Sequence, residues 1–326
     1  TCALPIFYHH NDFDGIASAA IFAKYLSITQ DIGLDDIQFN SLDYKIKSTW
    51  GNVKLERPCA VLDFLYHHDA DWWFDHHIST FLNETSSLNP YSRSRQKYWN
   101  TSFLSCPSLI VSHLYTYNRK LSIYLKRNYN ELIKWSDIID GARYEKPSDL
   151  FGFNNPYINI NKSLGLEQSS IYNFKIIKAL YLNDLAMLIN DSQYIDLINE
   201  LQVKEVNAIS IIKKIIHIEN RVAYFDQSNY DIPFQRYLAY YLFPDTLYRV
   251  GIHKIDQAFS VSVNFNNWSE QSNKINLGAL CRRLGGGGRF DVGAVLALTH
   301  DEALKKAEML KLWLKKADVT QLSFDI

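Results

Sequence analysis

The segment "HNDFDG", from His10 to Gly15, places one imidazole and two carboxylates at alternating positions of the chain. In an extended loop at the end of a strand, His10, Asp12 and Asp14 would all point toward the same side. Imidazole together with carboxylates suits Mn²⁺ or Mg²⁺ better than it suits a metal that prefers thiolates. Taken alone, this short motif also fits a solvated loop that is rich in aspartate.

Three later segments place similar side chains after apolar stretches or near a helix end. They are Asp63 in "CAVLDF", the triplet Asp75, His76 and His77 in "ADWWFDHH", and Asp137 with Asp140 in "WSDIIDGA". The continuous apolar runs before Asp63 and before the triplet predict central strands of a parallel sheet. Open α/β sheets bind ligands at the carboxyl ends of such strands. We therefore expect these residues to gather at one edge of a sheet.

The elements that must position these residues follow from the hydrophobic periodicity. Residues 6–9 predict a strand, residues 15–26 predict a helix, and about 171–218 read as a further helical stretch. After Arg221 the pattern changes to short strands such as "FSVSVNF" and to an amphipathic closing helix, "DEALKKAEMLKLWLKKA". The predicted organisation has a first domain over 1–205, a helical connector over 206–220 and a second domain over 221–326.

In this order, the motifs resemble those of the DHH phosphoesterase superfamily with a C-terminal DHHA1 domain, as in RecJ-like and oligoribonuclease-like proteins. Motif I corresponds to "HNDFDG", motif II to Asp63, motif III to "DHH" and motif IV to "WSDIIDG". The segment "INLGALCRRLGGGGRFDVGAVLAL" resembles the glycine-rich signature of DHHA1. The resemblance implies an α/β fold in which a parallel-sheet DHH domain is joined by helices to a smaller α/β domain. It also implies an active site in the cleft between the two domains.

The resemblance implies two divalent ions, Mn²⁺ in the first place and Mg²⁺ as the alternative, which would activate water for attack on phosphorus. One ion would be held by His10, Asp12 and Asp63. The other would be held by Asp14, Asp63, His76 and an aspartate of motif IV, with Asp63 bridging the two ions. The family pattern favours Asp137 as that aspartate, and leaves Asp140 to cap the turn before Gly141.

The same resemblance suggests roles for the rest of the "DHH" triplet. His77 is expected to donate to the phosphate or to the leaving oxygen, and Asp75 to orient its neighbours without binding an ion. The competing interpretation of Asp75 is a strand-end carboxylate that only bonds local backbone.

Four consecutive glycines, Gly285, Gly286, Gly287 and Gly288, indicate a place where the backbone must approach something closely. They follow Arg283 and precede Arg289, so backbone amides and guanidinium groups could form a phosphate cradle. A flexible loop tip is the other interpretation. The family commonly has His where Arg289 stands, which leaves an imidazole role at this position open.

The composition limits the class of partner. The net charge is −1, and residues 221–326 carry 13 Lys and Arg against 11 Asp and Glu, a net charge of +2. Proteins that track long nucleic acids rely on clustered basic residues, so we expect short substrates.

No apolar run is long enough to span a bilayer, and four scattered cysteines suggest neither a disulfide framework nor structural zinc. We expect a cytoplasmic protein without a membrane partner. Because the chain lacks an initiator Met, we also hypothesise that residues 1–6 are non-native.

The predicted function is hydrolysis of short oligonucleotides or dinucleotides by a metal-dependent phosphodiesterase. The alternatives are an inorganic pyrophosphatase or polyphosphatase, and a non-catalytic nucleotide-binding module. The sequence leaves open RNA against DNA, linear against cyclic substrates, the polarity of attack and the oligomeric state.

Overall fold

The computed structural model describes residues 5–81, 94–234, 236–272 and 275–319, and side chains as far as residue 316. The chain divides into two compact units, the first made of residues 1–144 and 153–201, and the second of residues 145–152 and 202–326. Cys59, Cys106 and Cys281 are buried free thiols, whereas residues 1–4, including Cys2, lie outside the described residues. Among the described residues, no helix is both long and apolar enough to cross a membrane.

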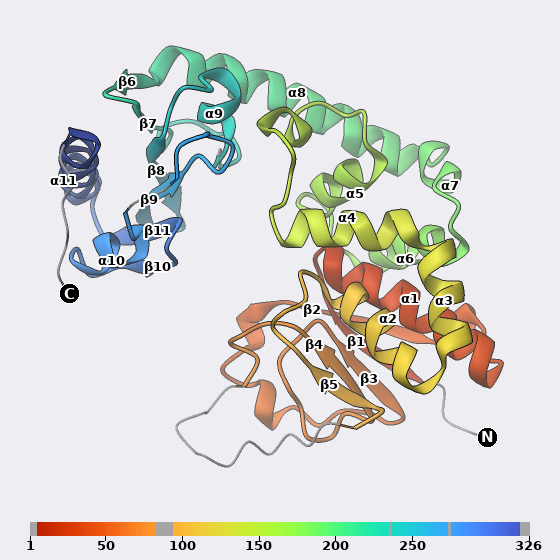
Figure 1. Cartoon of the computed structure of the whole chain (residues 1–326). Coiled ribbons are helices and arrows are strands. Elements are labelled where there is room, and N and C mark those ends of the chain that lie inside the picture. The colour runs from red at the N-terminus through yellow and green to blue at the C-terminus, as the bar shows by residue number, and fades with distance from the viewer. Residues whose placement is uncertain (1–4, 82–93, 235, 273–274, 320–326) are drawn as a thin grey trace. The chain divides into compact units, whose positions relative to one another are not determined.

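The first unit is built on a five-stranded sheet in which all neighbouring strands are parallel (Figure 1). In spatial order the strands are β2 (Gln38–Leu42), β1 (Ile6–His10), β3 (Cys59–Leu62), β4 (Trp72–Asp75) and β5 (Lys97–Trp99). Because the strands are parallel, their carboxyl ends share one edge of the sheet. Strands β1, β3 and β4 are neighbours, so the segments that follow them start side by side.

Both faces of this sheet are buried, which explains the continuous apolar runs of its central strands. Phe7 of β1 packs in the core between the sheet and the helices, whereas Ile6 and Tyr8 face a second cluster that contains Trp50 and Trp73. The helices of this unit are α1 (Phe13–Gln30), α2 (Cys106–Tyr117), α3 (Arg119–Asn128), α4 (Asn130–Asp140), α5 (Pro156–Leu164), α6 (Ser170–Leu182) and α7 (Ala186–Ile189). Short 3₁₀ turns occur at Leu34–Asp36, Tyr44–Ile46 and Trp50–Asn52.

The second unit contains a six-stranded mixed sheet. In spatial order its strands are β10 (Gly287–Gly288), β11 (Val292–Ala297), β9 (Ala258–Phe265), β8 (Tyr248–Ile255), β7 (Val222–Asp226) and β6 (His217–Glu219). Its helices are α9 (Leu238–Leu242), α10 (Leu277–Arg282) and α11 (His300–Val319), with a 3₁₀ turn at Pro147–Leu150, and α8 (Ser192–Ile215) runs from one unit into the other. Apolar side chains of β8, β9 and β11 form one core with those of α10 and α11.

The glycine-rich segment lets parts of the second unit pack closely on one another. A Cβ at Gly288 would lie 2.2 Å from the carbonyl oxygen of Val292, and one at Gly286 would lie 2.1 Å from that of Ala294. A Cβ at Gly278, on α10, would lie 2.3 Å from the Gly288 oxygen. The backbone of the glycine-rich segment therefore lies close to other atoms, as expected. Among the described residues, these atoms belong to the backbone of the same unit.

Candidate metal centre

Strand β1 ends at His10, and the loop after it leads directly into α1. Asp12 is the N-cap of this helix, since its side chain accepts a hydrogen bond from the Gly15 backbone N–H at 3.0 Å. Its other carboxylate oxygen lies 2.7 Å from His10 Nδ1. A Cβ at Gly15 would lie 2.2 Å from the His10 carbonyl oxygen, so only glycine fits this position without a shift. The motif thus fixes His10 and Asp12 beside each other at the helix N-terminus.

Asp63 follows strand β3 and is fully buried beneath this loop. Its backbone has φ +54°, in the left-handed region, and its N–H donates to the Phe74 carbonyl oxygen at 2.9 Å. Neither carboxylate oxygen accepts a hydrogen bond from any described group. Burial, and then the nearby carboxylates of Asp14 and Asp12, raise the pKa of Asp63 well above its usual value. To remain ionised, a carboxylate that is buried without hydrogen bonds needs a positively charged partner.

His76 connects Asp63 to two further carboxylates. Its Nε2 atom lies 3.4 Å from Asp14 Oδ2, 3.4 Å from Asp140 Oδ2 and 3.5 Å from Asp63 Oδ1. On the opposite side of the ring, Nδ1 lies 3.1 Å from the Phe103 carbonyl oxygen, an arrangement that fixes the ring with Nε2 toward the carboxylates. Although burial lowers the pKa of this imidazole, the hydrogen bond and charge of Asp14 raise it to about 9 overall.

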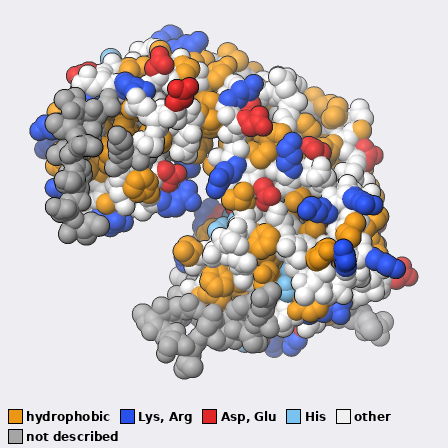
Figure 2. Space-filling model, viewed as in Figure 1, with side chains coloured by type: hydrophobic (Ala, Val, Ile, Leu, Met, Phe, Trp, Pro, Cys, Tyr) orange, Lys and Arg blue, Asp and Glu red, His pale blue; other side chains and the backbone are white. Residues whose placement is uncertain are grey.

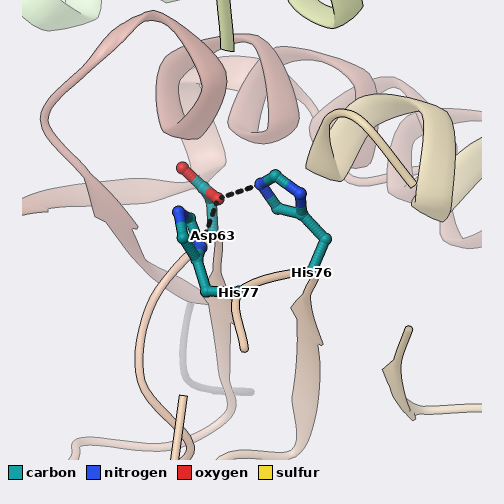
Figure 3. A group of neighbouring side chains, drawn as sticks. All are labelled: Asp63, His76 and His77. Atoms are coloured by element: carbon teal, nitrogen blue, oxygen red, sulfur yellow. Dashed lines mark ion pairs between the residues drawn. The ribbon is translucent and has the colours of Figure 1, made fainter. Parts of the chain in front are cut away.

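His77 approaches the same Asp63 oxygen from the other side, as Figure 3 shows. Its Nδ1 lies 3.6 Å from Asp63 Oδ1 and 2.8 Å from Asp75 Oδ1. The same Asp75 oxygen accepts from the backbone N–H groups of His76 and His77, at 2.7 Å and 3.2 Å. Asp75 therefore accepts hydrogen bonds from local backbone and also contacts the His77 ring. Its contacts fit both the local backbone role and the orienting role. The Nδ1 atom of His77 is thus engaged by carboxylates, while the side chain as a whole is 30% exposed.

The structure brings Asp140, and not Asp137, to this cluster. Asp140 is the last residue of α4 and its side chain is 26% exposed, whereas Asp137 lies one turn earlier. Asp137 Oδ1 accepts hydrogen bonds from the hydroxyl groups of Ser105 and Ser108, at 2.6 Å and 2.7 Å. Ser105 is itself the N-cap of α2. These serines hold Asp137 against α2, whereas Asp140 lies with Asp14 and His76 in a group that could hold an ion.

The donor set fits divalent metal ions. Three groups have ligand atoms close enough to hold an ion: His10, Asp12 and Asp63; Asp14, His76 and Asp140; and Asp63, His76 and His77. Oxygen and imidazole donors without thiolate suit divalent ions better than they suit a metal that prefers thiolates. Buried oxygens of Asp14 and Asp63, and His76 Nε2, have no hydrogen-bond partner among the described residues. Ions bound to these atoms would satisfy them.

Comparison with known proteins supports the same fold. No protein-family model matches the sequence, and the search of curated proteins returns no match. Among solved structures, a pGpG-specific phosphodiesterase, PggH from Vibrio cholerae, superposes with a TM-score of 0.71 at 16% identity, over 96% of this chain and 99% of that chain. RecJ from Thermus thermophilus, in complex with Mn²⁺, gives a TM-score of 0.53 at 12% identity, over 94% of this chain and 52% of that chain. An exonuclease RecJ bound to manganese gives 0.50 at 9% identity, over 95% and 89%.

The chain has the fold of DHH-family proteins. The α/β architecture expected from the sequence, a parallel-sheet unit followed by a second α/β unit, is confirmed. Within the DHH fold, the first three sequence motifs lie at the carboxyl ends of β1, β3 and β4, and the fourth lies at the end of α4.

In the second unit, only part of the predicted substrate-binding set comes together. Gly287, Gly288 and Arg289 line a cavity of about 400 Å³. Gly285 and Gly286 lie outside this lining, and Arg283 stacks over the Trp313 ring at 5.2 Å. The Arg289 side chain is largely exposed, with Nε 3.8 Å from Asp291 Oδ1.

Sequence analysis missed Arg249, which is fully buried and lies on the wall of this cavity. The available signal was the alternation in "YRVGIHKI" and "FSVSVNF". In the second segment every other residue is polar, although the strand is buried almost along its whole length. A buried strand with a polar face suggests a ligand on that face.

Proposed function

We propose that this protein is a metal-dependent phosphodiesterase that hydrolyses short oligonucleotides or dinucleotides with two divalent ions, Mn²⁺ or Mg²⁺. The observation that carries the proposal is Asp63, a fully buried carboxylate whose two oxygens accept no hydrogen bond from a described group. Its Oδ2 lies 3.8 Å from His10 Nδ1, and its Oδ1 lies 3.5 Å from His76 Nε2. One carboxylate thus faces both ligand groups, as a bridge between two ions would.

The residues around Asp63 divide into ligands and positioning groups. His10, Asp12 and Asp63 would hold one ion, and Asp14, Asp63, His76 and Asp140 would hold the other. Bound ions would supply a water activated for attack and would neutralise the charge on the phosphoryl group. Asp75 orients His77, which donates through Nε2 to a substrate oxygen.

The distribution of charge supports short substrates. On the face visible in Figure 2, Lys and Arg side chains are scattered among acidic and hydrophobic ones and form no continuous stripe. A long single strand is generally held by a basic groove with stacking aromatics, at about four or more nucleotides per binding fold. The similarity to PggH, a pGpG-specific phosphodiesterase, agrees with a dinucleotide or a short oligomer.

The test is one Mn²⁺ assay that compares a linear dinucleotide, a cyclic dinucleotide, a long single-stranded DNA and pyrophosphate. We expect the fastest turnover among the short nucleotides, and loss of activity on chelation. Asp63→Asn should abolish turnover, whereas Asp35→Asn, at an exposed position of the same unit, should not change it. Exclusive cleavage of pyrophosphate, processive degradation of the long strand as best substrate, or full activity of Asp63→Asn would reject the proposal.

A further inference from the structure

The loop after strand β2 brings a tyrosine to the candidate metal centre. In the parallel pairing of β1 with β2, His10 lies opposite Leu42, and the backbone N–H of Asn11 donates to the Leu42 carbonyl oxygen at 3.0 Å. The segment after Leu42 therefore begins beside the motif that contains His10. Its second residue, Tyr44, opens the 3₁₀ turn Tyr44–Ile46. The register between two parallel strands thus places Tyr44 at the same edge of the sheet as the candidate ligands.

The ring of Tyr44 packs against two other rings of the first unit. Its centre lies 4.7 Å from that of the His10 ring, with the planes 55° apart, and 5.2 Å from that of Phe64, with the planes 27° apart. Phe64 is the residue after Asp63 and is fully buried, and Trp50 packs edge-on against it at 5.1 Å. A buried aromatic layer therefore supports Tyr44 beside the imidazole of His10.

Tyr44 also approaches His77, which comes from a different motif. The two ring centres are 6.4 Å apart, and the planes are nearly perpendicular, at 80°. His10 and His77 face different oxygens of one carboxylate, since His10 Nδ1 lies 3.8 Å from Asp63 Oδ2 and His77 Nδ1 lies 3.6 Å from Asp63 Oδ1. One tyrosine ring is therefore close to both histidines that flank Asp63.

The phenol of Tyr44 lies in the electrostatic field of the acidic cluster. Burial, and then the charges of nearby carboxylates, raise the pKa of this phenol above its usual value. In order of effect, these carboxylates are Asp63, Asp75, Asp12 and Asp140, so all four motifs act on it. A tyrosine is protonated at neutral pH even without this shift, and among the described residues none is hydrogen-bonded to this hydroxyl group. The hydroxyl group is therefore available to donate to a ligand.

The aromatic support fixes the direction of this hydroxyl group. The oxygen of a tyrosine lies on the long axis of its ring, so a ring that packs on both Phe64 and His10 leaves the atom little freedom. A donor that is held in place before the reaction stabilises developing charge more effectively than a mobile one. A phenol also adds a hydrogen bond without adding a further charge to a cluster that is rich in carboxylates.

We propose that Tyr44 is a catalytic residue of this phosphodiesterase, and that its hydroxyl group donates a hydrogen bond to a non-bridging oxygen of the phosphoryl group under attack. The inference rests on the proposed function and deepens it, because it adds a fixed donor to the ion-binding residues and His77. In the transition state, negative charge is spread over the equatorial oxygens of the phosphoryl group. A hydrogen bond to one of these oxygens raises kcat more than it lowers KM.

The first test removes the hydroxyl group and keeps the ring. Tyr44→Phe should lower kcat on a linear dinucleotide with Mn²⁺ roughly 100–1,000-fold, with little change in KM. It should keep both Mn²⁺ ions, measured by elemental analysis, and the thermal midpoint of the wild type. Tyr124→Phe is the matched control, because this tyrosine of α3 is 41% exposed, and it should leave kcat unchanged. A wild-type kcat in Tyr44→Phe, or loss of bound Mn²⁺ in this variant, would overturn the proposal.

A second test identifies the atom that accepts the hydrogen bond. It uses dinucleotides in which sulfur replaces one non-bridging oxygen, as the separate Rp and Sp isomers, because sulfur accepts hydrogen bonds only weakly. For one isomer, sulfur should slow the wild type strongly and slow Tyr44→Phe much less, since both changes remove the same hydrogen bond. Sulfur effects that are equal in the two proteins for both isomers contradict the assignment.

Binding of orthovanadate tests the inference apart from turnover. Orthovanadate imitates a phosphoryl group in the geometry of its transition state, and the readout is the part of its binding, measured by calorimetry, that requires Mn²⁺. Tyr44→Phe should weaken this binding roughly tenfold or more, whereas Tyr124→Phe should not change it. Equal affinity of the wild type and Tyr44→Phe would show that Tyr44 does not contact the phosphoryl group. If the wild type hydrolyses no nucleotide but Tyr44→Phe still weakens binding, the role of Tyr44 stands and the phosphodiesterase proposal fails.

Discussion

His76 Nε2 lies 3.4 Å from Asp140 Oδ2, and this contact joins the loop after strand β4 to the last residue of helix α4. The same His76 atom also lies 3.4 Å from Asp14 Oδ2, at the start of helix α1. One imidazole therefore brings together side chains from three elements that are far apart in the sequence. The position of α4 thus decides whether the second ligand group is complete.

The first prediction compares the two aspartates of α4. Asp140→Asn should lower kcat/KM by more than the roughly 10–100-fold that is typical of groups behind a metal ligand. It should also reduce bound Mn²⁺ from two ions per chain to about one, measured by elemental analysis. Asp137→Asn should keep both ions and cost only about 1 kcal/mol of stability, through its two serine hydrogen bonds. Loss of an ion in Asp137→Asn instead would restore the original assignment of the ligand.

A second prediction concerns Asp75 as a positioning residue. Asp75→Asn should keep bound Mn²⁺ but reduce kcat about 10–100-fold, because the His77 ring loses its charged partner at 2.8 Å. The double variant Asp75→Asn with His77→Ala should be little worse than His77→Ala alone, since both changes remove the same function. Fully additive effects in this double-mutant cycle would show that Asp75 acts independently of His77.

The third prediction concerns stability with and without metal. In EDTA, Asp63→Asn should melt at a higher temperature than the wild type, because it removes a charge from a buried group without hydrogen-bond donors. Mn²⁺ should raise the thermal midpoint of the wild type. The free energy of unfolding should increase by about 2.7 kcal/mol for each site when the Mn²⁺ concentration is 100 times Kd. Asp63→Asn should show a much smaller increase. A wild-type midpoint that does not respond to Mn²⁺ would contradict binding at this cluster.

A fourth prediction tests the close contact of Gly15 with His10. Gly15→Ala should cost about 1–3 kcal/mol of stability and weaken Mn²⁺ binding, because the new Cβ would push against the His10 carbonyl oxygen. Gly51→Ala is the matched control, since nothing lies within 4 Å of a Cβ there, and its effect should stay within about 0.5 kcal/mol. Both values can be measured by denaturant unfolding. Equal effects of the two changes would argue against a special constraint at Gly15.

The central strands could be predicted from the local sequence, because their burial requires continuous runs of apolar residues. Strands β1, β3 and β4 are buried on both faces, so each appears as a continuous apolar run that ends in acidic or imidazole residues. The edge strands β2 and β5 were missed. β2 has only Leu42 buried, and β5 is three residues long, so neither produces such a run.

By itself, the sequence determined which residue types stand at the ends of the central strands. It therefore identified four candidate ligands: His10, Asp12, Asp63 and His76. Only the tertiary structure shows that Asp140, and not Asp137, lies beside His76. The two lie one turn apart on α4, and hydrogen bonds from α2 hold the first while the second meets His76. Tertiary structure also placed Arg249 opposite Asn264, because strand register and a facing glycine, rather than local pattern, determine which polar side chains share a cavity.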